Sequence, residues 1–411
     1  MSRIAIAVAA LAALTVSCGV DSQPGAIRSD APLAYTTRPR VVEADLIPFV
    51  VSDIRFTTTV ERPGDPDLYG VDQDGRVLRI ERPTVDDVRL DGTLTGPVGD
   101  RSTLDDVVLD IIELTESAGE EGLVGLAFDP SGRLAYIHHS RIADGHSVVA
   151  EYQVGADGVF DPATRRELFV VEQYSPNHNA GQLLFGPDGY LYAAFGDGSI
   201  AADQYKTALD LGSPLGKILR VDPTATADAP YTVPADNPFV DTPGADPRIW
   251  SLGLRNPFSF SFDQLTGDMW VADVGQARFE EVNFSIATNG VDAGRGVDYG
   301  WSQYEALTPY RGDQETDNHQ PPRFFYEHPN PECGAVADGL VVRDSRVPLL
   351  DGWYTYGDWC AGLVWARDTL QLDAEPVVLG TMPGFTQMLQ MADGNVYASS
   401  QLGSIALVAP G

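Results

Sequence analysis

The sequence predicts an all-β chain folded as a six-bladed β-propeller with long inter-strand loops. No stretch between residues 46 and 411 has sustained helical periodicity, whereas one short pattern recurs: an apolar strand, a turn rich in Asp and Gly, and a second alternating strand. Each copy is typical of a β-hairpin, which cannot bury its apolar face alone, so the copies must pack side by side. A closed ring of such units leaves no exposed sheet edge. The copies lie at residues 67–80, 126–137, 183–194, 260–272, 353–365 and 389–398.

The two ends of the chain predict how the ring closes. The first copy is short on its N-terminal side, and the chain ends in an apolar segment at residues 405–409. We therefore expect both ends to share one blade. A seven-bladed propeller and an elongated sandwich are the alternatives that the repeats leave open.

The N-terminus has the pattern of an export signal. Arg3 precedes an apolar run that is too short to span a bilayer and that ends in Thr-Val-Ser-Cys at residues 15–18. This ending resembles a bacterial lipobox and predicts lipidation of Cys18; ordinary signal-peptidase cleavage nearby is the alternative. We expect an exported protein, either periplasmic or held at the cell surface as a lipoprotein. The chain then divides into a signal peptide at 1–18, a flexible tether at 19–45 and the propeller at 46–411.

Charge and cysteine content limit partners and compartment. The formal net charge of −32 argues against nucleic acid and anionic membranes, because phosphate contacts need clustered Arg and Lys. Membrane contact is expected only through the N-terminal lipid anchor. Without Cys18, two cysteines remain, Cys333 and Cys360. Export to an oxidising compartment makes a disulfide between them the default, with two reduced buried thiols as the alternative.

Longer segments go beyond a generic propeller pattern. In chain order they resemble the glucose/sorbosone dehydrogenase family, whose soluble aldose dehydrogenases use pyrroloquinoline quinone (PQQ) on a six-bladed propeller. The segment YGDWCAG at 356–362 resembles the hedgehog-interacting-protein-like branch, which shares the fold but is not defined by PQQ chemistry. The segments that carry the resemblance are EEGLVGLAFDP at 120–130, HNAGQLLFGPDG at 178–189, GKILR at 216–220, GLRNP at 253–257, DVGQ at 273–276, EEVN at 280–283 and YGW at 299–301.

The resemblance implies a site for sugar oxidation. His178 matches the base that removes the C1 hydroxyl proton of an aldose while a hydride passes to the quinone, and a neutral imidazole suits that task. Arg255 and Asn256 match residues that contact the cofactor through charge-assisted hydrogen bonds. Without the family, His178 is typical of a surface loop residue and Arg255 of a structural residue that caps blade carbonyls.

The resemblance also implies calcium. Glu281 and Tyr299, the latter through its carbonyl, match a structural calcium site, and the carbonyls of Gly275 and Gln276 match the place where calcium bridges to the cofactor. Oxygen ligands of this kind suit a hard cation. The alternative is that Glu280 and Glu281 are solvated loop acids.

The cofactor site departs from the family pattern. PQQ carries three carboxylates, whose burial needs cationic partners. The family's basic positions fall here near Cys360 and in residues 384–386, and none of these is basic. Glu120 stands where the family has a cofactor-contacting Gln. Since no lysine follows residue 217, a replacement cation in the C-terminal half has to be an arginine. The candidates are Arg343, Arg346 and Arg367.

Three functions follow from these residues. The first is a PQQ-dependent aldose dehydrogenase with calcium as electrophile. The second is a non-catalytic propeller lipoprotein that binds a carbohydrate or a protein through the same central funnel. The third is a hydrolase of the propeller lactonase kind, in which calcium and His178 activate water.

Overall fold

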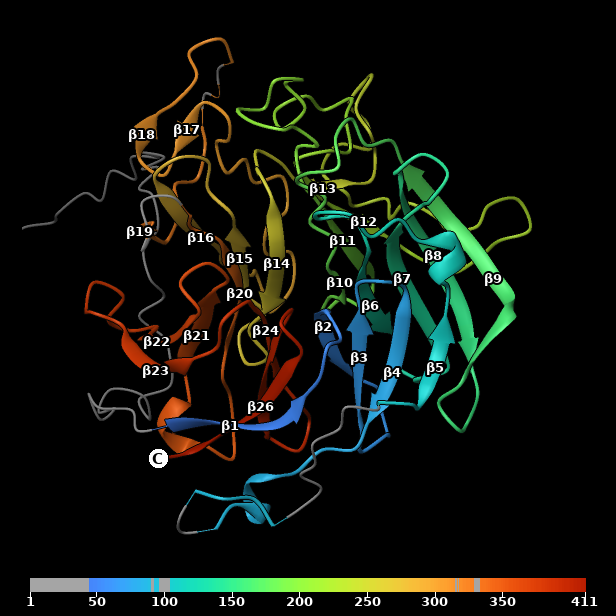
Figure 1. The fold of residues 1–411 in the computed structure, drawn as a ribbon. Helices are drawn as coiled ribbons and strands as arrows, with labels where there is room; N and C mark the ends of the chain where they lie inside the picture. Colours follow the sequence, from blue (N-terminus) through green and yellow to red (C-terminus); the bar gives the residue numbers. More distant parts are fainter. Residues whose placement is uncertain (1–43, 90–91, 96–103, 315, 317, 329–332) are drawn as a thin grey trace, which may run out of the picture. The chain divides into compact units, whose positions relative to one another are not determined.

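The computed structural model describes residues 44–89, 92–95, 104–314, 316, 318–328 and 333–411 (Figure 1). Contacts within the chain divide it into two units, residues 1–37 and 38–411, and all described residues belong to the second. The signal peptide, Cys18 and almost all of the tether lie outside the described residues. No helix among the described residues is long and apolar enough to cross a membrane.

The described residues form six antiparallel four-stranded sheets and one small two-stranded sheet. The four-stranded sheets are β2-β3-β4-β5, β6-β7-β8-β9, β10-β11-β12-β13, β14-β15-β16-β19, β20-β21-β22-β23 and β1-β26-β25-β24. The strands are β1 (Ala44–Val51), β2 (Phe56–Glu61), β3 (Leu68–Asp72), β4 (Arg76–Ile80), β5 (Val107–Asp110), β6 (Leu123–Phe128), β7 (Leu134–Ser140), β8 (Ser147–Val154), β9 (Phe160–Val171), β10 (Leu183–Phe185), β11 (Leu191–Phe195), β12 (Lys217–Val221), β13 (Ile249–Ser251), β14 (Pro257–Phe262), β15 (Met269–Asp273), β16 (Phe279–Ser285), β17 (Tyr304–Glu305), β18 (Thr308–Pro309), β19 (Phe324–Glu327), β20 (Val336–Val341), β21 (Trp353–Asp358), β22 (Leu363–Asp368), β23 (Val377–Thr381), β24 (Phe385–Gln390), β25 (Val396–Ser400) and β26 (Ser404–Pro410). Within the described residues, three short 3-10 helices lie at η2 (Val85–Asp87), η3 (Ile112–Leu114) and η4 (Pro348–Leu350).

The sheets are the blades of a six-bladed β-propeller, as the sequence predicts. Each of the repeated segments is a hairpin in a different blade. Four of them supply the first and second strands of their blade. The segments at 67–80 and 353–365 are instead second and third strands, so the innermost strands β2 and β20 precede them. The first strands contact one another around the ring, β2 with β6 and β24, and β20 with β14 and β24.

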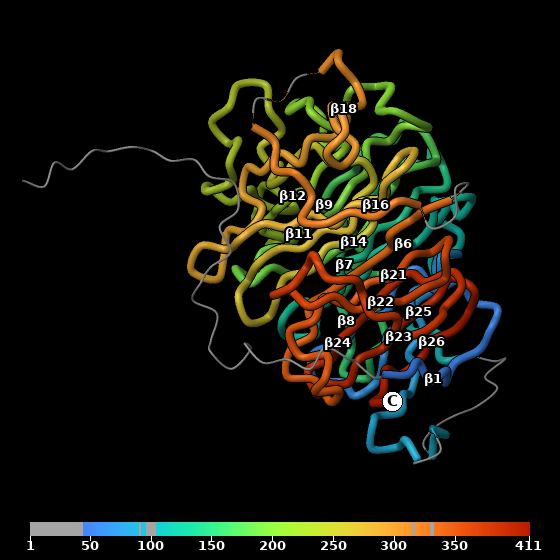
Figure 2. Tube along the Cα trace, turned by 90° about the vertical axis from the view of Figure 1, so that its left-hand side faces the viewer, coloured from blue at the N-terminus to red at the C-terminus, as the bar shows by residue number. Residues whose placement is uncertain are grey.

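The two ends of the chain share the last blade, which confirms the predicted closure. β1 pairs antiparallel with β26, from Ala44 opposite Pro410 to Val51 opposite Ser404 (Figure 2). β1 begins at Ala44, so the last two residues of the expected tether belong to the strand. Phe49 is buried at 2% exposure and packs edge-on against Tyr397, whereas Val51 is 60% exposed. The N-terminal strand β1 is therefore the fourth strand of the blade formed by the C-terminal strands β24, β25 and β26.

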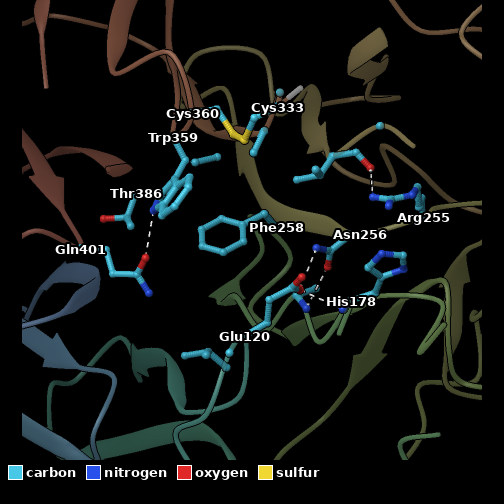
Figure 3. A pocket seen from close by; sticks show the side chains of 18 of the residues that line it. Glu120, His178, Arg255, Asn256, Phe258, Cys333, Trp359, Cys360, Thr386 and Gln401 are labelled. Carbon is cyan, nitrogen blue, oxygen red and sulfur yellow. Dashed lines mark hydrogen bonds between the residues drawn. A yellow bond between two sulfur atoms is a disulfide. The ribbon is translucent and has the colours of Figure 1, made fainter. Parts of the chain in front are cut away.

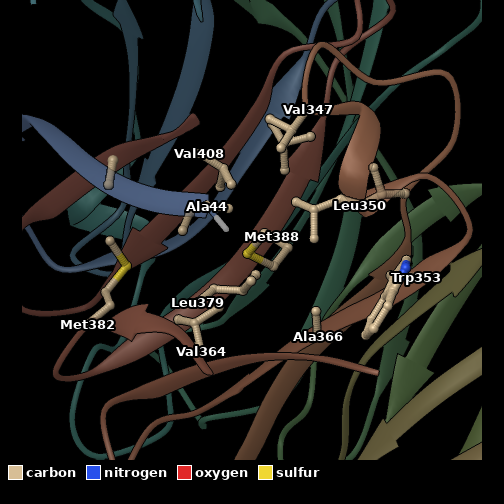
Figure 4. Close-up of a cluster of buried hydrophobic side chains, with 14 of the residues drawn as sticks. Ala44, Val347, Leu350, Trp353, Val364, Ala366, Leu379, Met382, Met388 and Val408 are labelled. Atoms are coloured by element: carbon tan, nitrogen blue, oxygen red, sulfur yellow. The ribbon is translucent and has the colours of Figure 1, made fainter. Parts of the chain in front are cut away.

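Apolar side chains fill the spaces between neighbouring blades. Figure 4 shows the cluster between the blade of β20–β23 and the closing blade, where Val364 and Leu379 meet Met388 and Val408. Alternating strand residues face such clusters because side chains of a strand point to opposite faces of its sheet. These clusters pack neighbouring blades against one another.

Candidate functional site

A pocket of about 490 Å³ lies at the end of the propeller where the innermost strands begin (Figure 3). In an antiparallel blade the start of the first strand and the end of the second lie at the same edge, so residues of all six blades meet there. The volume is within the range of small-molecule sites. Lining residues used below are Gln73, Glu120, His178, Arg255, Asn256, Phe258, Gly275, Gln276, His328, Cys333, Trp359, Cys360, Thr386 and Gln401.

His178 lies in the loop before β10 and lines this pocket with 4% of its surface exposed. Its Nδ1 lies 2.6 Å from Oδ1 of the fully buried Asp197. Since a carboxylate only accepts hydrogen bonds, this contact places a proton on Nδ1 and leaves the Nε2 lone pair available to a ligand hydroxyl. Trp301 Nε1 donates to the other Asp197 oxygen at 2.8 Å, which fixes the carboxylate. The pair has the geometry of an oriented general base.

The sequence did not identify Asp197 as a site residue. It follows β11 in a short Gly-rich loop, and nothing in the local pattern separates it from the many other turn aspartates. Only the packing of blade three against its own N-terminal loop brings Asp197 under His178.

Glu120 and Asn256 brace the loop that carries His178. The His178 backbone N–H donates to Glu120 Oε2 at 2.8 Å, and Asn256 Nδ2 donates to the same oxygen at 3.2 Å. Asn256 Oδ1 in turn accepts the Ala180 N–H at 3.0 Å. These bonds hold His178 in a left-handed backbone conformation, with φ of 57°, that non-glycine residues rarely adopt.

Arg255 reaches the pocket, and two of its guanidinium nitrogens donate hydrogen bonds within the protein. Nη1 donates to the Val274 carbonyl at 2.8 Å and Nε to Gln276 Oε1 at 3.2 Å. The backbone N–H groups of Arg255 and Asn256 donate to the Asp273 carboxylate at 3.0 and 2.7 Å. Burial raises the pKa of Asp273 to about 7, and the nearby Arg255 charge opposes that rise. Arg255 thus stabilises the loop after β15.

The residues expected to bind calcium lie in and beneath this same loop. Gly275 and Gln276 line the pocket. Glu281 is buried below it and accepts the Ala306 N–H at 2.6 Å, and burial raises its pKa to about 8. The Tyr299 hydroxyl bonds to that of Ser285 at 2.8 Å.

The acidic side chains beside this loop have partners in the backbone. Among the described residues no cluster of three or more His, Cys, Asp or Glu side chains is placed to hold a metal ion. Asp273 and Glu281 already accept backbone N–H groups. Calcium binding by Gly275, Gln276, Glu281 and Tyr299 stays a prediction.

The opposite wall of the pocket contains a disulfide. Cys333 and Cys360 are bonded, as predicted, with Cα atoms 5.8 Å apart, and both line the pocket. Beside them Trp359, which is 41% exposed, donates from Nε1 to Gln401 Oε1 at 2.9 Å. Gln401 donates to Gln73 at 2.6 Å, and Gln73 Nε2 donates to the Gly119 carbonyl at 2.8 Å. A chain of hydrogen bonds thus runs along the rim from Trp359 to the segment that carries Glu120.

The three arginines proposed as replacement cations are not in the pocket, which corrects that expectation. Arg343 pairs with Asp263 at 2.9 Å, and Arg346 pairs with Asp86 at 3.1 Å. Arg367 donates to the Ala374 carbonyl at 2.7 Å. Each lies on a strand or loop whose position in its blade directs it to a local acceptor. Within the described part of the chain, Arg255 is the one Arg or Lys that lines the pocket.

The structure is a six-bladed propeller with a pocket at the end of the ring where the innermost strands begin. The Glucose / Sorbosone dehydrogenase family model matches residues 73–354, more than half of the chain, and the chain belongs to this family.

The relatives of this chain include proteins named for hedgehog interaction and proteins named as sugar dehydrogenases. The chain is 32% identical to the HIPL1 protein of Arabidopsis thaliana over 58% of this chain and 37% of that one. It is 28% identical to the human Hedgehog-interacting protein over 66% of this chain and 39% of that one. The matches thus span well under half the length of these relatives. The PQQ-bound aldose sugar dehydrogenase of Streptomyces coelicolor has the same fold, with a TM-score of 0.62 and 17% identity over 90% of this chain and 99% of that chain.

The pocket residues do not fit PQQ. Burying three carboxylates requires several cationic donors, and the described lining offers the guanidinium of Arg255, whose Nη1 and Nε already have acceptors. A disulfide and Thr386 stand where the family resemblance places basic residues. The Glu120 carboxylate adds repulsion. The base geometry is present, but the charge that would hold the quinone is not.

Proposed function

We propose that this chain is a binding propeller whose central pocket takes a carbohydrate of monosaccharide size, and that it does not work as a PQQ-dependent dehydrogenase. The observation that carries the proposal is the composition of the pocket wall. Trp359 and Phe258 supply apolar faces of the kind that pack against a sugar ring, and amide and carboxylate groups around them supply hydrogen-bond partners for hydroxyls.

The His178–Asp197 pair supports the same ligand class. With Nδ1–H held by Asp197, the Nε2 atom of His178 is an acceptor for a ligand hydroxyl. In this proposal the imidazole binds and orients that hydroxyl. If an oxidant were bound beside the ligand, His178 would instead remove the proton from that hydroxyl.

The quinone-dependent function meets a thermodynamic obstacle. A buried carboxylate that lacks a charge-assisted hydrogen bond is disfavoured by roughly 1.5–3 kcal/mol, and two missing bonds of this kind weaken binding by about a hundredfold or more. This estimate supports ligand binding over redox catalysis. The alternative binding function is recognition of a protein, which the name of the human relative describes for that relative.

Reconstitution tests the proposal directly. Purified protein is incubated with PQQ and Ca²⁺, desalted, and examined for quinone absorbance and for dye reduction with a panel of aldoses. We expect no retained quinone and no turnover, together with measurable heat of binding for at least one sugar in the same preparation. Stoichiometric quinone after desalting, or aldose-dependent dye reduction, contradicts the proposal.

We also propose that the protein is exported and anchored through Cys18. The Cys333–Cys360 disulfide supports export, because disulfides persist in oxidising compartments. Mass spectrometry of the membrane fraction tests the anchor: a mature N-terminus at Cys18 carrying acyl chains is expected, and an unmodified N-terminus elsewhere contradicts it.

A further inference from the structure

The charge of Glu120 faces the pocket without compensation. Its Oε2 accepts the His178 N–H and the Asn256 amide, both neutral donors, at 2.8 and 3.2 Å. Its other oxygen has no hydrogen-bond partner among the described residues, and no side-chain nitrogen of Lys, Arg or His in that part of the chain lies within 4.0 Å of the carboxylate. The side chain is solvent-exposed and lines the pocket. The two donors therefore hold the carboxylate in place without neutralising it.

The two histidines on the pocket wall are paired with acidic side chains, and Arg255 donates to neutral acceptors. His328 pairs with the buried Glu280 at 2.9 Å, and His178 pairs with Asp197 at 2.6 Å. Arg255 donates to the Val274 carbonyl, and its charge acts on the buried Asp273. Among the described lining residues, Glu120 is thus the exposed charged side chain with no opposite charge within 4.0 Å, whereas Arg255, which also lacks an ion pair, is buried.

Aromatic rings share the pocket with this carboxylate. Trp359 is 41% exposed, and its bond to Gln401 fixes the orientation of the indole. Phe258 lies between Trp359 and Glu120 in the view of Figure 3. Aromatic faces attract cations, and they also pack against the C–H faces of sugar rings. A carboxylate combined with two aromatic faces is the arrangement that recognises an ammonium group carried on an apolar or sugar framework.

We propose that the ligand of this pocket is a monosaccharide-sized molecule that carries a primary ammonium group, as a hexosamine does. Glu120 pairs with the ammonium, while Trp359 and Phe258 cover the ring. This inference rests on the proposed binding function and names its ligand class. The net charge of −32 favours the same ligand, because a strongly negative protein raises the local concentration of cations.

Titration calorimetry with four probes tests the inference. Glucosamine, N-acetylglucosamine, glucose and glucuronate share a pyranose framework and differ in charge. We expect glucosamine to bind roughly tenfold more tightly than N-acetylglucosamine or glucose, the ratio typical of gaining one charge-assisted hydrogen bond. We also expect its affinity alone to fall as salt is raised.

Variants assign the preference to Glu120. Glu120→Gln should bring the glucosamine-to-glucose affinity ratio close to one and remove the salt dependence of that ratio, because the amide keeps an acceptor oxygen but loses the charge. Glu113→Gln is the matched control, since Glu113 is exposed and does not line the pocket. The salt titration of the unchanged protein needs no variant and stands even if Glu120→Gln folds poorly.

The outcomes separate the two proposals. Equal, salt-independent affinity for glucosamine and glucose overturns the ammonium inference and leaves carbohydrate binding intact. Preference for glucuronate also overturns it, because Arg255 would then dominate recognition. Absence of heat with all four probes removes both the inference and the monosaccharide-binding function.

Discussion

Removing the Cys333–Cys360 disulfide should measurably destabilise the propeller. The bond joins cysteines 27 residues apart, between the segment before β20 and the turn after β21. The loop-closure entropy of 27 residues corresponds to about 3.5 kcal/mol at 25 °C for the doubly substituted Cys333→Ser, Cys360→Ser chain. Unfolding entropy of about 2.1 cal/mol/K per residue, taken over the propeller, converts this to a Tm lower by roughly 4–5 °C.

Differential scanning calorimetry measures that shift. The unchanged protein is scanned with and without a reductant, and the double-serine variant is scanned under both conditions. Reductant should lower the Tm of the unchanged protein toward that of the variant and should leave the variant unaffected. A variant that melts within about 1 °C of the oxidised protein refutes the reasoning, because the cross-link would then not restrict the unfolded chain.

Two further predictions concern ring closure and a buried acid. Phe49→Ala should lower the free energy of unfolding by about 3–4 kcal/mol in denaturant titrations, because Phe49 is 2% exposed. Val51→Ala is the control in the same strand and should change it by less than about 0.5 kcal/mol, because Val51 is 60% exposed. Similar effects of both substitutions would contradict the closure of the ring by β1. Burial raises the pKa of Asp338 from 3.8 to about 6, so its contribution to stability is present below pH 4 and is lost, by roughly 3 kcal/mol, as the pH rises through 6. Between pH 4 and 7 the melting temperature of Asp338→Asn should therefore fall less steeply with rising pH than that of the unchanged protein. Equal slopes for the two proteins would show that Asp338 is not the source of this pH dependence.

The architecture follows from local sequence. Asp-Gly turns between alternating strands identify hairpins because turn geometry and side-chain alternation are properties of a few consecutive residues. Such segments as 126–137 and 389–398 are hairpins in the structure for that reason. The apolar segment at 405–409 likewise predicted a closing blade, since an apolar strand needs a partner.

The character of the pocket follows from contacts that no local pattern contains. The sequence alone predicted hairpins packed as propeller blades, a family resemblance that points to His178, and the loss of the family's basic residues, whereas the structure fixed the number of blades at six. The tertiary structure decided that Asp197 orients His178, that Arg343, Arg346 and Arg367 pair elsewhere, and that Trp359 shares the pocket with Glu120. These residues lie on different blades or loops, and only the closing of the ring determines which side chains meet at its centre.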